Sequence, residues 1–212
     1  VSIAAYLLDM KAVSWALFRI NQAAYVVLWV LTLARLWHHF SRFMADLTDH
    51  SRGPGFFTLI AGTCVLGVQY VLLASHFSMA VFLWILGIVL WVVVMYTFFA
   101  AAAVQKQKSP LESSINGGWL LAVVSTQSLA VLGALVASQF AASREVILFS
   151  ALCLYLAGAM LYILIISLIF YRLMFFGVES ETLTPTYWIN MGAVAITTLA
   201  GSTLILNAGQ WA

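Results

Sequence analysis

Six long apolar runs separated by short polar breaks constrain the fold of this chain more than any other feature of its sequence. They cover residues 12–38, 56–76, 79–104, 118–140, 146–176 and 185–207. A helix of about 20 apolar residues crosses the hydrocarbon core of a bilayer. The runs lack the alternation of apolar and polar residues that strands show, and helices satisfy their own backbone hydrogen bonds in lipid. The sequence therefore predicts an all-α integral membrane protein.

Composition supports this class and excludes others. Apolar residues make up 64% of the chain and charged residues 8%, whereas soluble proteins carry about 25% charged residues. The net charge of +2 is small and scattered, so we expect the lipid bilayer, and no nucleic acid, as a partner. The two cysteines, Cys64 and Cys153, lie inside apolar runs and form no disulfide or metal-binding pattern. No cofactor is expected.

The first ten residues form a shorter apolar run, which in a helix reaches about half the thickness of the hydrocarbon core. We interpret it as part of a truncated helix. The alternative is a complete protein with a short interfacial segment at its start. The chain then contains about seven transmembrane helices, the first truncated, in a single transmembrane domain covering residues 1–212.

The orientation follows from the basic residues. The longer polar breaks, at residues 39–55, 105–117 and 177–184, all fall on one side of the membrane in this arrangement. Basic residues are more frequent on that side, with Arg35, Arg42, Arg52, Lys106, Lys108 and Arg172 against Lys11, Arg19 and Arg144. Loops rich in lysine and arginine stay in the cytoplasm. The third, fifth and seventh predicted helices therefore begin at the cytoplasmic surface.

Small and hydroxyl-bearing residues gather in these odd-numbered helices. Their glycines are Gly62, Gly67, Gly118, Gly133, Gly192 and Gly201, whereas the fourth and sixth helices contain only Gly87 and Gly158. Small residues allow close helix packing, and hydroxyls can line a passage. We therefore expect odd helices inside and even helices outside, with Phe82, Trp84 and Trp91 of the fourth helix facing lipid. Simple helix packing explains the same enrichment equally well.

The prolines mark where the inner helices begin. Pro54, Pro110 and Pro185 lie at or just before the third, fifth and seventh predicted helices, and proline suits the first turn of a helix. Thr184 and Asn116 are placed to act as N-caps. Three helix N-termini, with unpaired N–H groups and positive dipole ends, would then face the cytoplasmic mouth and favour anions. The alternative is that these prolines mark helix starts as in any bundle.

Acidic residues are absent from the predicted membrane interior. All seven lie in loops or at helix ends: Asp9, Asp46, Asp49, Glu112, Glu145, Glu179 and Glu181. Proton- and sodium-coupled carriers commonly place an ionisable group in the bilayer, so this pattern argues against a cation route. His38, His39 and His50 match no metal-binding motif, and no nucleophile–base pattern indicates an enzyme. We expect neither a metal site nor an enzyme.

Three stretches carry a family resemblance, and each enters one of the inner helices. They are residues 52–58 (RGPGFFT), 116–127 (NGGWLLAVVSTQ) and 183–192 (LTPTYWINMG). They are similar to the tellurite-resistance/C4-dicarboxylate transporter family, which includes malate transporters, sulfite exporters and slow anion channels. The resemblance covers nearly the whole chain. It implies ten helices in five hairpins, of which this chain supplies about the first seven and lacks helices 8–10, and assembly as a homotrimer.

The resemblance also implies a function: transport of small anions or organic acids, of the C4-dicarboxylate (malate), sulfite or tellurite type, across the bacterial plasma (inner) membrane. The central pore would be lined by the odd-numbered helices. Carried over residue by residue, the pore or substrate path contains Phe57, Thr58, Trp119, Ser125, Thr126, Gln127, Tyr187, Asn190 and Thr197. Family members carry mid-membrane prolines that this chain lacks, and Gly67, Gly133 and Gly201 can take their role. The alternatives are a proton-coupled solute carrier and, after it, a membrane-embedded enzyme.

Overall fold

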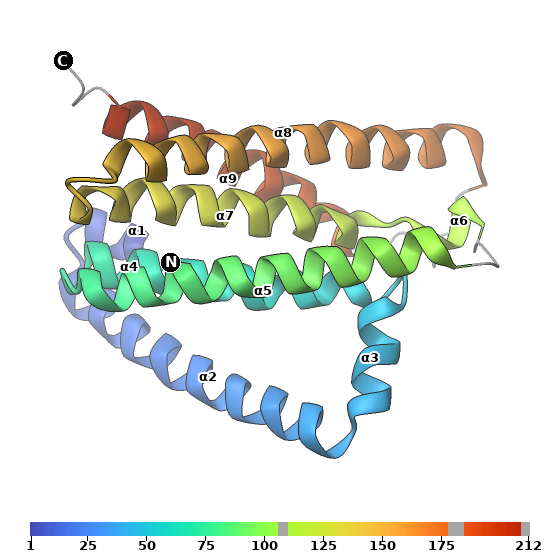
Figure 1. Cartoon of the computed structure of the whole chain (residues 1–212), viewed down its shortest axis with the longest axis horizontal. Helices are drawn as coiled ribbons and strands as arrows, with labels where there is room; N and C mark the ends of the chain where they lie inside the picture. The colour runs from blue at the N-terminus through green and yellow to red at the C-terminus, as the bar shows by residue number, and fades with distance from the viewer. Residues whose placement is uncertain (106–109, 178–184, 209–212) are drawn as a thin grey trace.

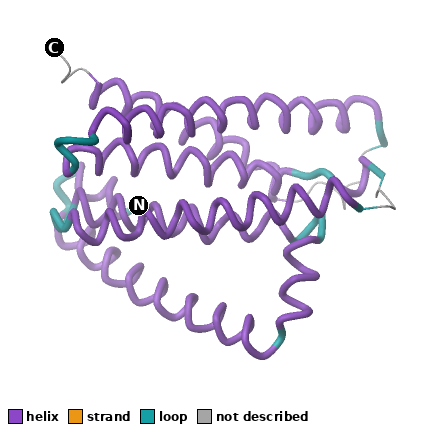
Figure 2. Tube along the Cα trace, in the orientation of Figure 1, coloured by secondary structure: helices purple, strands orange, loops and turns teal. Residues whose placement is uncertain are grey.

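The computed structural model of this protein describes residues 1–105, 110–177 and 185–208. These residues form helices joined by turns, and no strand occurs among them (Figure 1; Figure 2). Six of the helices in this part of the chain are long and apolar enough to cross a membrane. They are α2 (Lys11–His38), α4 (Phe57–Leu72), α5 (Phe77–Val104), α7 (Leu120–Val136), α8 (Arg144–Phe175) and α9 (Ile189–Ala208). The predicted all-α membrane class is confirmed.

Short 3-10 turns extend three of these helices. They are η1 (Gly53–Phe56) before α4, η2 (Gly117–Trp119) before α7, η3 (Ala137–Gln139) after α7, and η5 (Pro185–Trp188) before α9. The first apolar run forms α1 (Ser2–Leu7), a helix of 6 residues. Because it rises only about 1.5 Å per residue, it is too short to cross a bilayer.

Two further helices lie in breaks that the sequence analysis treats as loops. The helix α6 (Leu111–Ser114) is a single turn, whereas α3 (Phe40–Thr48) runs across the bundle rather than along it (Figure 1). In α3, Leu47 is buried and Met44 is half-buried, while Arg42 is exposed. Positions three residues apart share a helix face, so α3 is amphipathic. Its polar face lowers the hydropathy of the segment, which is why the break reads as a loop in the sequence.

The helix α7 lies at the centre of the bundle. Over its span 83% of the residues are buried, against 6% for α2. Its most extensive contacts are with α8, followed by α9 and α4, and it also contacts α5. Small residues at Ala122, Ala130 and Ala134 are fully buried and allow the neighbouring backbones to approach closely. The third and fifth predicted helices, α4 and α7, are the most buried, whereas the seventh, α9, is less buried than the fourth, α5, so the expected alternation of inner and outer helices holds only in part.

The glycines expected to replace proline kinks lie at helix contacts instead. A Cβ at Gly67 would lie 2.5 Å from a methyl group of Leu132, and one at Gly133 would lie 3.0 Å from the indole nitrogen of Trp84. Gly201 faces a tyrosine ring of α8 in the same way. These glycines make room for a side chain of the next helix, which accounts for their place in the sequence.

The expected lipid-facing position of two tryptophans is wrong. Trp84 is only 8% exposed and donates to the carbonyl oxygen of Leu129 at 3.2 Å. Trp91 donates to the hydroxyl oxygen of Thr126 at 2.8 Å. An indole N–H finds no acceptor among acyl chains, and α7 supplies one for each tryptophan. Phe82, which has no polar group, is 58% exposed on the same helix, as predicted.

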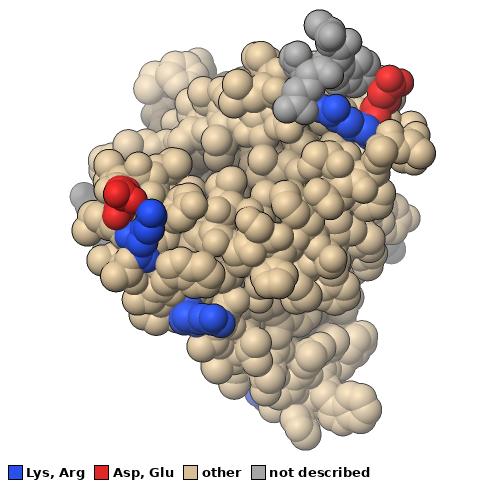
Figure 3. All heavy atoms as spheres, turned by 90° about the vertical axis from the view of Figure 1, so that its left-hand side faces the viewer, with Lys and Arg blue, Asp and Glu red and all other residues tan. Residues whose placement is uncertain are grey.

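The two ends of the bundle differ in charge. The end where α4, α7 and α9 finish is mostly uncharged but carries Lys11, Arg19 and Arg144 together with Asp9 and Glu145 (Figure 3). The opposite end carries Arg35, Arg42, Arg52 and Arg172 together with Asp46 and Asp49. The α4, α7 and α9 helices therefore begin at the more basic end of the described structure.

Candidate functional site

Three 3-10 turns, η1, η2 and η5, meet at the end of the bundle where α4, α7 and α9 begin (Figure 1). The turn η2 contacts both of the others. A Cβ on Gly118 would lie 3.8 Å from the Cβ of Pro54 in η1, and one on Gly117 would overlap the backbone of Thr186 and Tyr187 in η5. The two glycines let three chain segments pack backbone to backbone. The predicted convergence of three helix N-termini is present.

The capping pattern explains how these turns begin. The side-chain oxygen of Asn116 accepts a hydrogen bond from the backbone N–H of Gly118 at 2.8 Å, so the predicted N-cap is confirmed. Pro54 lies in the first turn of η1 and Pro185 begins η5. Pro110 precedes α6 rather than α7. The predicted cap at Thr184 lies outside the described residues.

Arg172 adds a positive charge to this end. It lies in the last turn of α8 and donates to the carbonyl oxygen of Ile115 at 2.9 Å and to the hydroxyl oxygen of Tyr187. Its guanidinium group therefore ties the segment before η2 to η5. Together with the positive ends of three helix dipoles, it makes the junction of the turns electropositive.

A small cavity of about 90 Å³ lies between α1, α4, α7 and α9. These four elements correspond to the first, third, fifth and seventh predicted helices. The lining residues are Ile3, Cys64, Val65, Val68, Ser128, Val131, Ile196 and Leu199. None of them carries a charge. The arrangement therefore places a neutral, mostly apolar space among the inner helices.

One face of α4 continues from this cavity toward the basic end. Val65 lines the cavity, and Gly62 and Thr58, three and seven residues earlier, are exposed. The spacing places all three on one side of the helix. A Cβ at Gly62 would meet no atom within 4 Å, so the space beside it is open. Thr58, a predicted pore residue, donates to the carbonyl oxygen of Gly55 at 2.6 Å.

Three predicted pore residues of α7 face neighbouring helices. Ser125, Thr126 and Gln127 are fully buried. Thr126 accepts from Trp91 of α5, and Gln127 donates to the carbonyl oxygen of Tyr155 of α8 at 3.1 Å. The side-chain oxygen of Gln127 has no hydrogen-bond partner among the described residues. None of the three lines the cavity.

The aromatic residues predicted for the path form contacts at the basic end. Phe57 is fully buried and packs edge to face against Phe98, with ring centres 5.8 Å apart. Trp119 lies 5.0 Å from the same Phe98 ring and donates to the carbonyl oxygens of His50 and Ser114. These residues fix η2 against α5 and the segment after α3.

The remaining predicted residues lie on η5 and α9. Tyr187 accepts from Arg172, and Asn190 accepts from the hydroxyl group of Tyr162 at 3.1 Å. Thr197 donates to the carbonyl oxygen of Ala193, one turn earlier. The structure thus brings Trp119 and Tyr187 to the same junction of turns, while Thr197 lies farther along the helix.

None of the nine predicted path residues lines the cavity, and Ser128 is the hydroxyl-bearing lining residue that the sequence analysis missed. It lies one residue after the buried Gln127, and nothing in the sequence distinguishes its hydroxyl from those of Ser125 and Thr126. The half-buried positions of α7, Leu121 and Val124, share its face. That face is defined by how the neighbouring helices pack, so the sequence alone carries no signal for Ser128.

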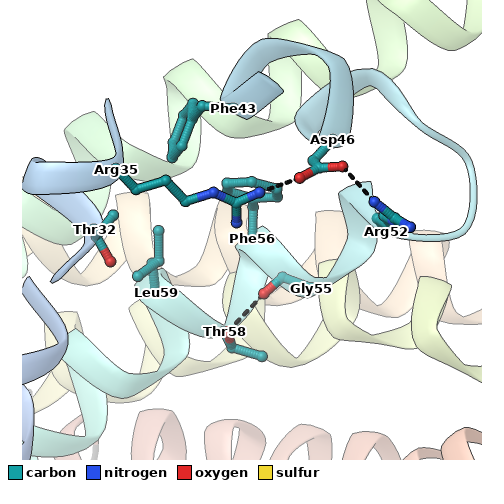
Figure 4. A pocket seen from close by; sticks show the side chains of 9 residues that line it. All are labelled: Thr32, Arg35, Phe43, Asp46, Arg52, Gly55, Phe56, Thr58 and Leu59. Carbon is teal, nitrogen blue, oxygen red and sulfur yellow. Dashed lines mark hydrogen bonds and ion pairs between the residues drawn. The ribbon is translucent and has the colours of Figure 1, made fainter. Parts of the chain in front are cut away.

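A polar pocket of about 310 Å³ lies beside η1, between the end of α2, α3 and the start of α4 (Figure 4). Arg35 and Arg52 donate to the two carboxylate oxygens of Asp46, and the Arg52 bond is 2.9 Å long. Hydrogen bonds from Arg52 and Arg35 hold the pKa of Asp46 below its ordinary value, so this carboxylate is charged at neutral pH. Asp46 and Asp49 together raise the pKa of Arg52, so two guanidinium groups face two carboxylates and the cluster is neutral overall.

Comparison with known proteins indicates the family of this chain. A family model described as voltage-dependent anion channel matches residues 1–211. An uncharacterized transporter of Methanocaldococcus jannaschii is 21% identical over 203 residues, which are 95% of this chain and 58% of that protein. No solved structure matches the chain significantly. Because the family model matches nearly the whole chain, the protein belongs to the voltage-dependent anion channel family, which includes the tellurite-resistance/dicarboxylate transporters.

Proposed function

We propose that the protein transports small anions or organic acids through a conduit lined by α1, α4, α7 and α9. One observation carries the proposal: these four elements surround a cavity whose lining residues are all uncharged. A fixed negative charge in a low-dielectric passage would repel an anion strongly, and this lining has none. Membership of an anion-channel family supports the same assignment.

The electrostatics of the basic end support anions over cations. The turns before α4, α7 and α9 place the positive ends of three helix dipoles at that end, and Arg172 lies among them. A positive mouth raises the local concentration of anions and lowers that of cations. We infer that anions enter or leave the conduit at this end.

The substrate class and the setting are inferred from the family. We propose a substrate of the C4-dicarboxylate, sulfite or tellurite type, a location in the bacterial inner membrane and assembly as a homotrimer. The nine residues assigned to the path by family resemblance remain predictions. Ser125, Thr126 and Gln127 do not line the described cavity. We propose that the path follows the cavity, on the opposite side of α7 from these three residues.

The transport proposal is tested by narrowing the cavity in the full-length protein. Val65 lines the cavity and is 43% exposed, whereas Val93 of α5 is 54% exposed and lies away from it. We expect Val65→Trp to reduce anion flux into proteoliposomes by about tenfold or more, because the indole fills the passage. Val93→Trp adds the same bulk outside the passage and should leave flux unchanged.

Flux of chloride, malate and sulfite is measured in parallel with flux of sodium and potassium. Cation flux without anion flux in the unmodified protein would reject the proposal. Equal loss of flux in the two tryptophan variants would reject the conduit between α1, α4, α7 and α9 while leaving anion transport in place.

A further inference from the structure

The pocket in Figure 4 presents two guanidinium groups to a space of about 310 Å³. Asp46 bridges them, accepting from Arg35 through one carboxylate oxygen and from Arg52 through the other. Proteins bind carboxylate and phosphate ligands with the same donors, because the guanidinium fork matches two oxygens. The pocket therefore has the donors of an anion site, and a carboxylate of the chain itself fills it.

The ion pairs of this cluster are open to exchange. The side chains of Arg35 and Arg52 are 50% and 75% exposed, while that of Asp46 is 16% exposed. Water screens exposed ion pairs and makes them weak. A dissolved anion can therefore reach both arginines and compete with Asp46. The competing carboxylate belongs to α3, whereas Arg35 lies in α2 and Arg52 directly precedes η1.

The pocket and the cavity are separate, and both are lined in part by α4. Thr58 lines the pocket and Val65 lines the cavity. Between them, on the same face, lies Gly62 with open space beside it. In Figure 4 the Thr58 side chain lies on the far side of Gly55 from the arginines. Thr58 and Gly62 therefore lie between the pocket and the cavity along α4.

We propose that Arg35 and Arg52 form an anion-binding site at the entrance of the conduit, and that the Asp46 carboxylate occupies this site as an internal competitor. The ligand is a small anion with at least two oxygens, such as a carboxylate or a tetrahedral oxyanion. This inference rests on the proposed transport function for its place in the path. Binding itself depends only on the pocket.

Direct binding to the full-length protein in lipid nanodiscs tests the site. Succinate and sulfate, one carboxylate and one tetrahedral oxyanion, are titrated calorimetrically into the unmodified protein and into Asp46→Asn. Removing the competitor should tighten binding of at least one probe by about fivefold or more, which corresponds to about 1 kcal/mol. Asp46→Ser should tighten binding by the same factor. Two variants are used so that misfolding of one of them does not decide the test. Size-exclusion profiles establish that each variant is folded.

Two further sets of variants test whether the tighter binding of the probe arises in the pocket. Arg35→Gln and Arg52→Gln, each added to Asp46→Asn, should abolish the tighter binding, because only one guanidinium group then remains to hold the anion. Arg42→Gln is the matched control: Arg42 is exposed on α3 and does not line the pocket. Asp9→Asn removes an exposed carboxylate in the turn between α1 and α2, away from the pocket, and should change binding of neither probe.

The outcomes separate this inference from the transport proposal. If neither probe binds more tightly to folded Asp46→Asn or Asp46→Ser, the internal competitor does not exist. If the gain survives loss of either arginine, the site lies elsewhere. Anion flux in proteoliposomes with no change in binding would overturn the site but not transport. A gain in binding with no anion flux would support the site and reject the conduit.

Discussion

Hydroxyl groups in the described helices are mostly engaged with backbone carbonyl groups one turn earlier. Thr126 donates to Ala122, and Ser128 donates to Val124. Such bonds satisfy a donor in a medium without water. A serine or threonine in a membrane helix therefore need not face a passage. At the residue scale, only the surroundings of each hydroxyl decide whether it lines a path or supports helix packing.

Replacing the Thr126 hydroxyl should affect stability rather than transport. In Thr126→Val the indole N–H of Trp91 loses its acceptor, and we expect a loss of about 1 kcal/mol in unfolding free energy. Thr198→Val is the control, because Thr198 is exposed and donates one turn back in the same way, to Val194. Denaturant or thermal unfolding in detergent gives stability, and proteoliposome flux gives transport. A large loss of flux with unchanged stability would place Thr126 in the path after all.

Individual site residues are the part that the sequence predicts least well. The motif around Asn116 predicts its cap correctly, because capping depends on local chain geometry. The orientation of Ser125 and Gln127 depends on where α5 and α8 lie, which one helical segment does not encode. Trp84 and Trp91 show the same limit, since each finds a partner on α7, at Leu129 or Thr126.

At the scale of elements, length and hydropathy predict the long helices well. Six apolar runs became six spanning helices among the described residues, because lipid leaves the backbone few alternatives. The short elements were missed for a physical reason. The helix α3 is amphipathic, so its mean hydropathy resembles that of a loop, and the 3-10 turns η1, η2 and η5 depend on contacts with one another.

The close contact between η2 and η5 should require Gly117, because glycine has only a hydrogen where other residues have a Cβ. A Cβ there would overlap the carbonyl oxygen of Thr186, so Gly117→Ala must separate the starts of α7 and α9. We expect a loss of about 2 kcal/mol or more in unfolding free energy. Gly62→Ala is the control, because a Cβ there meets nothing within 4 Å. Equal thermal stability of the two variants in detergent would contradict the close packing of the turns.

At the scale of the whole molecule, composition and family resemblance are sufficient to predict the class. The small number of charged residues requires a membrane, and the motifs at the starts of the third, fifth and seventh predicted helices identified the family to which the chain belongs. The expectation that the odd-numbered helices lie inside also follows from their small residues. The existence and place of the cavity do not, because they depend on how four separate elements pack together.

The orientation of the molecule is predicted from its charge asymmetry. The end with η1, η2 and η5 is more basic, so it should face the cytoplasm. In a protein with Cys64 and Cys153 replaced by alanine, a cysteine at Ser51 should react with an impermeant maleimide only after the cells are permeabilised. A cysteine at Ala141, exposed in the turn between α7 and α8, should react in intact cells. The reverse labelling pattern would invert the topology.

The apolar lining of the cavity has a consequence for selectivity. A volume of about 90 Å³ holds about three water molecules, too few for a full hydration shell. The Ser128 hydroxyl already donates to Val124, so the wall offers little to replace lost water. An ion crossing this segment must shed part of its shell, and that cost grows with charge density. Among anions of equal charge, those that hold water least tightly should therefore pass first, with nitrate ahead of fluoride.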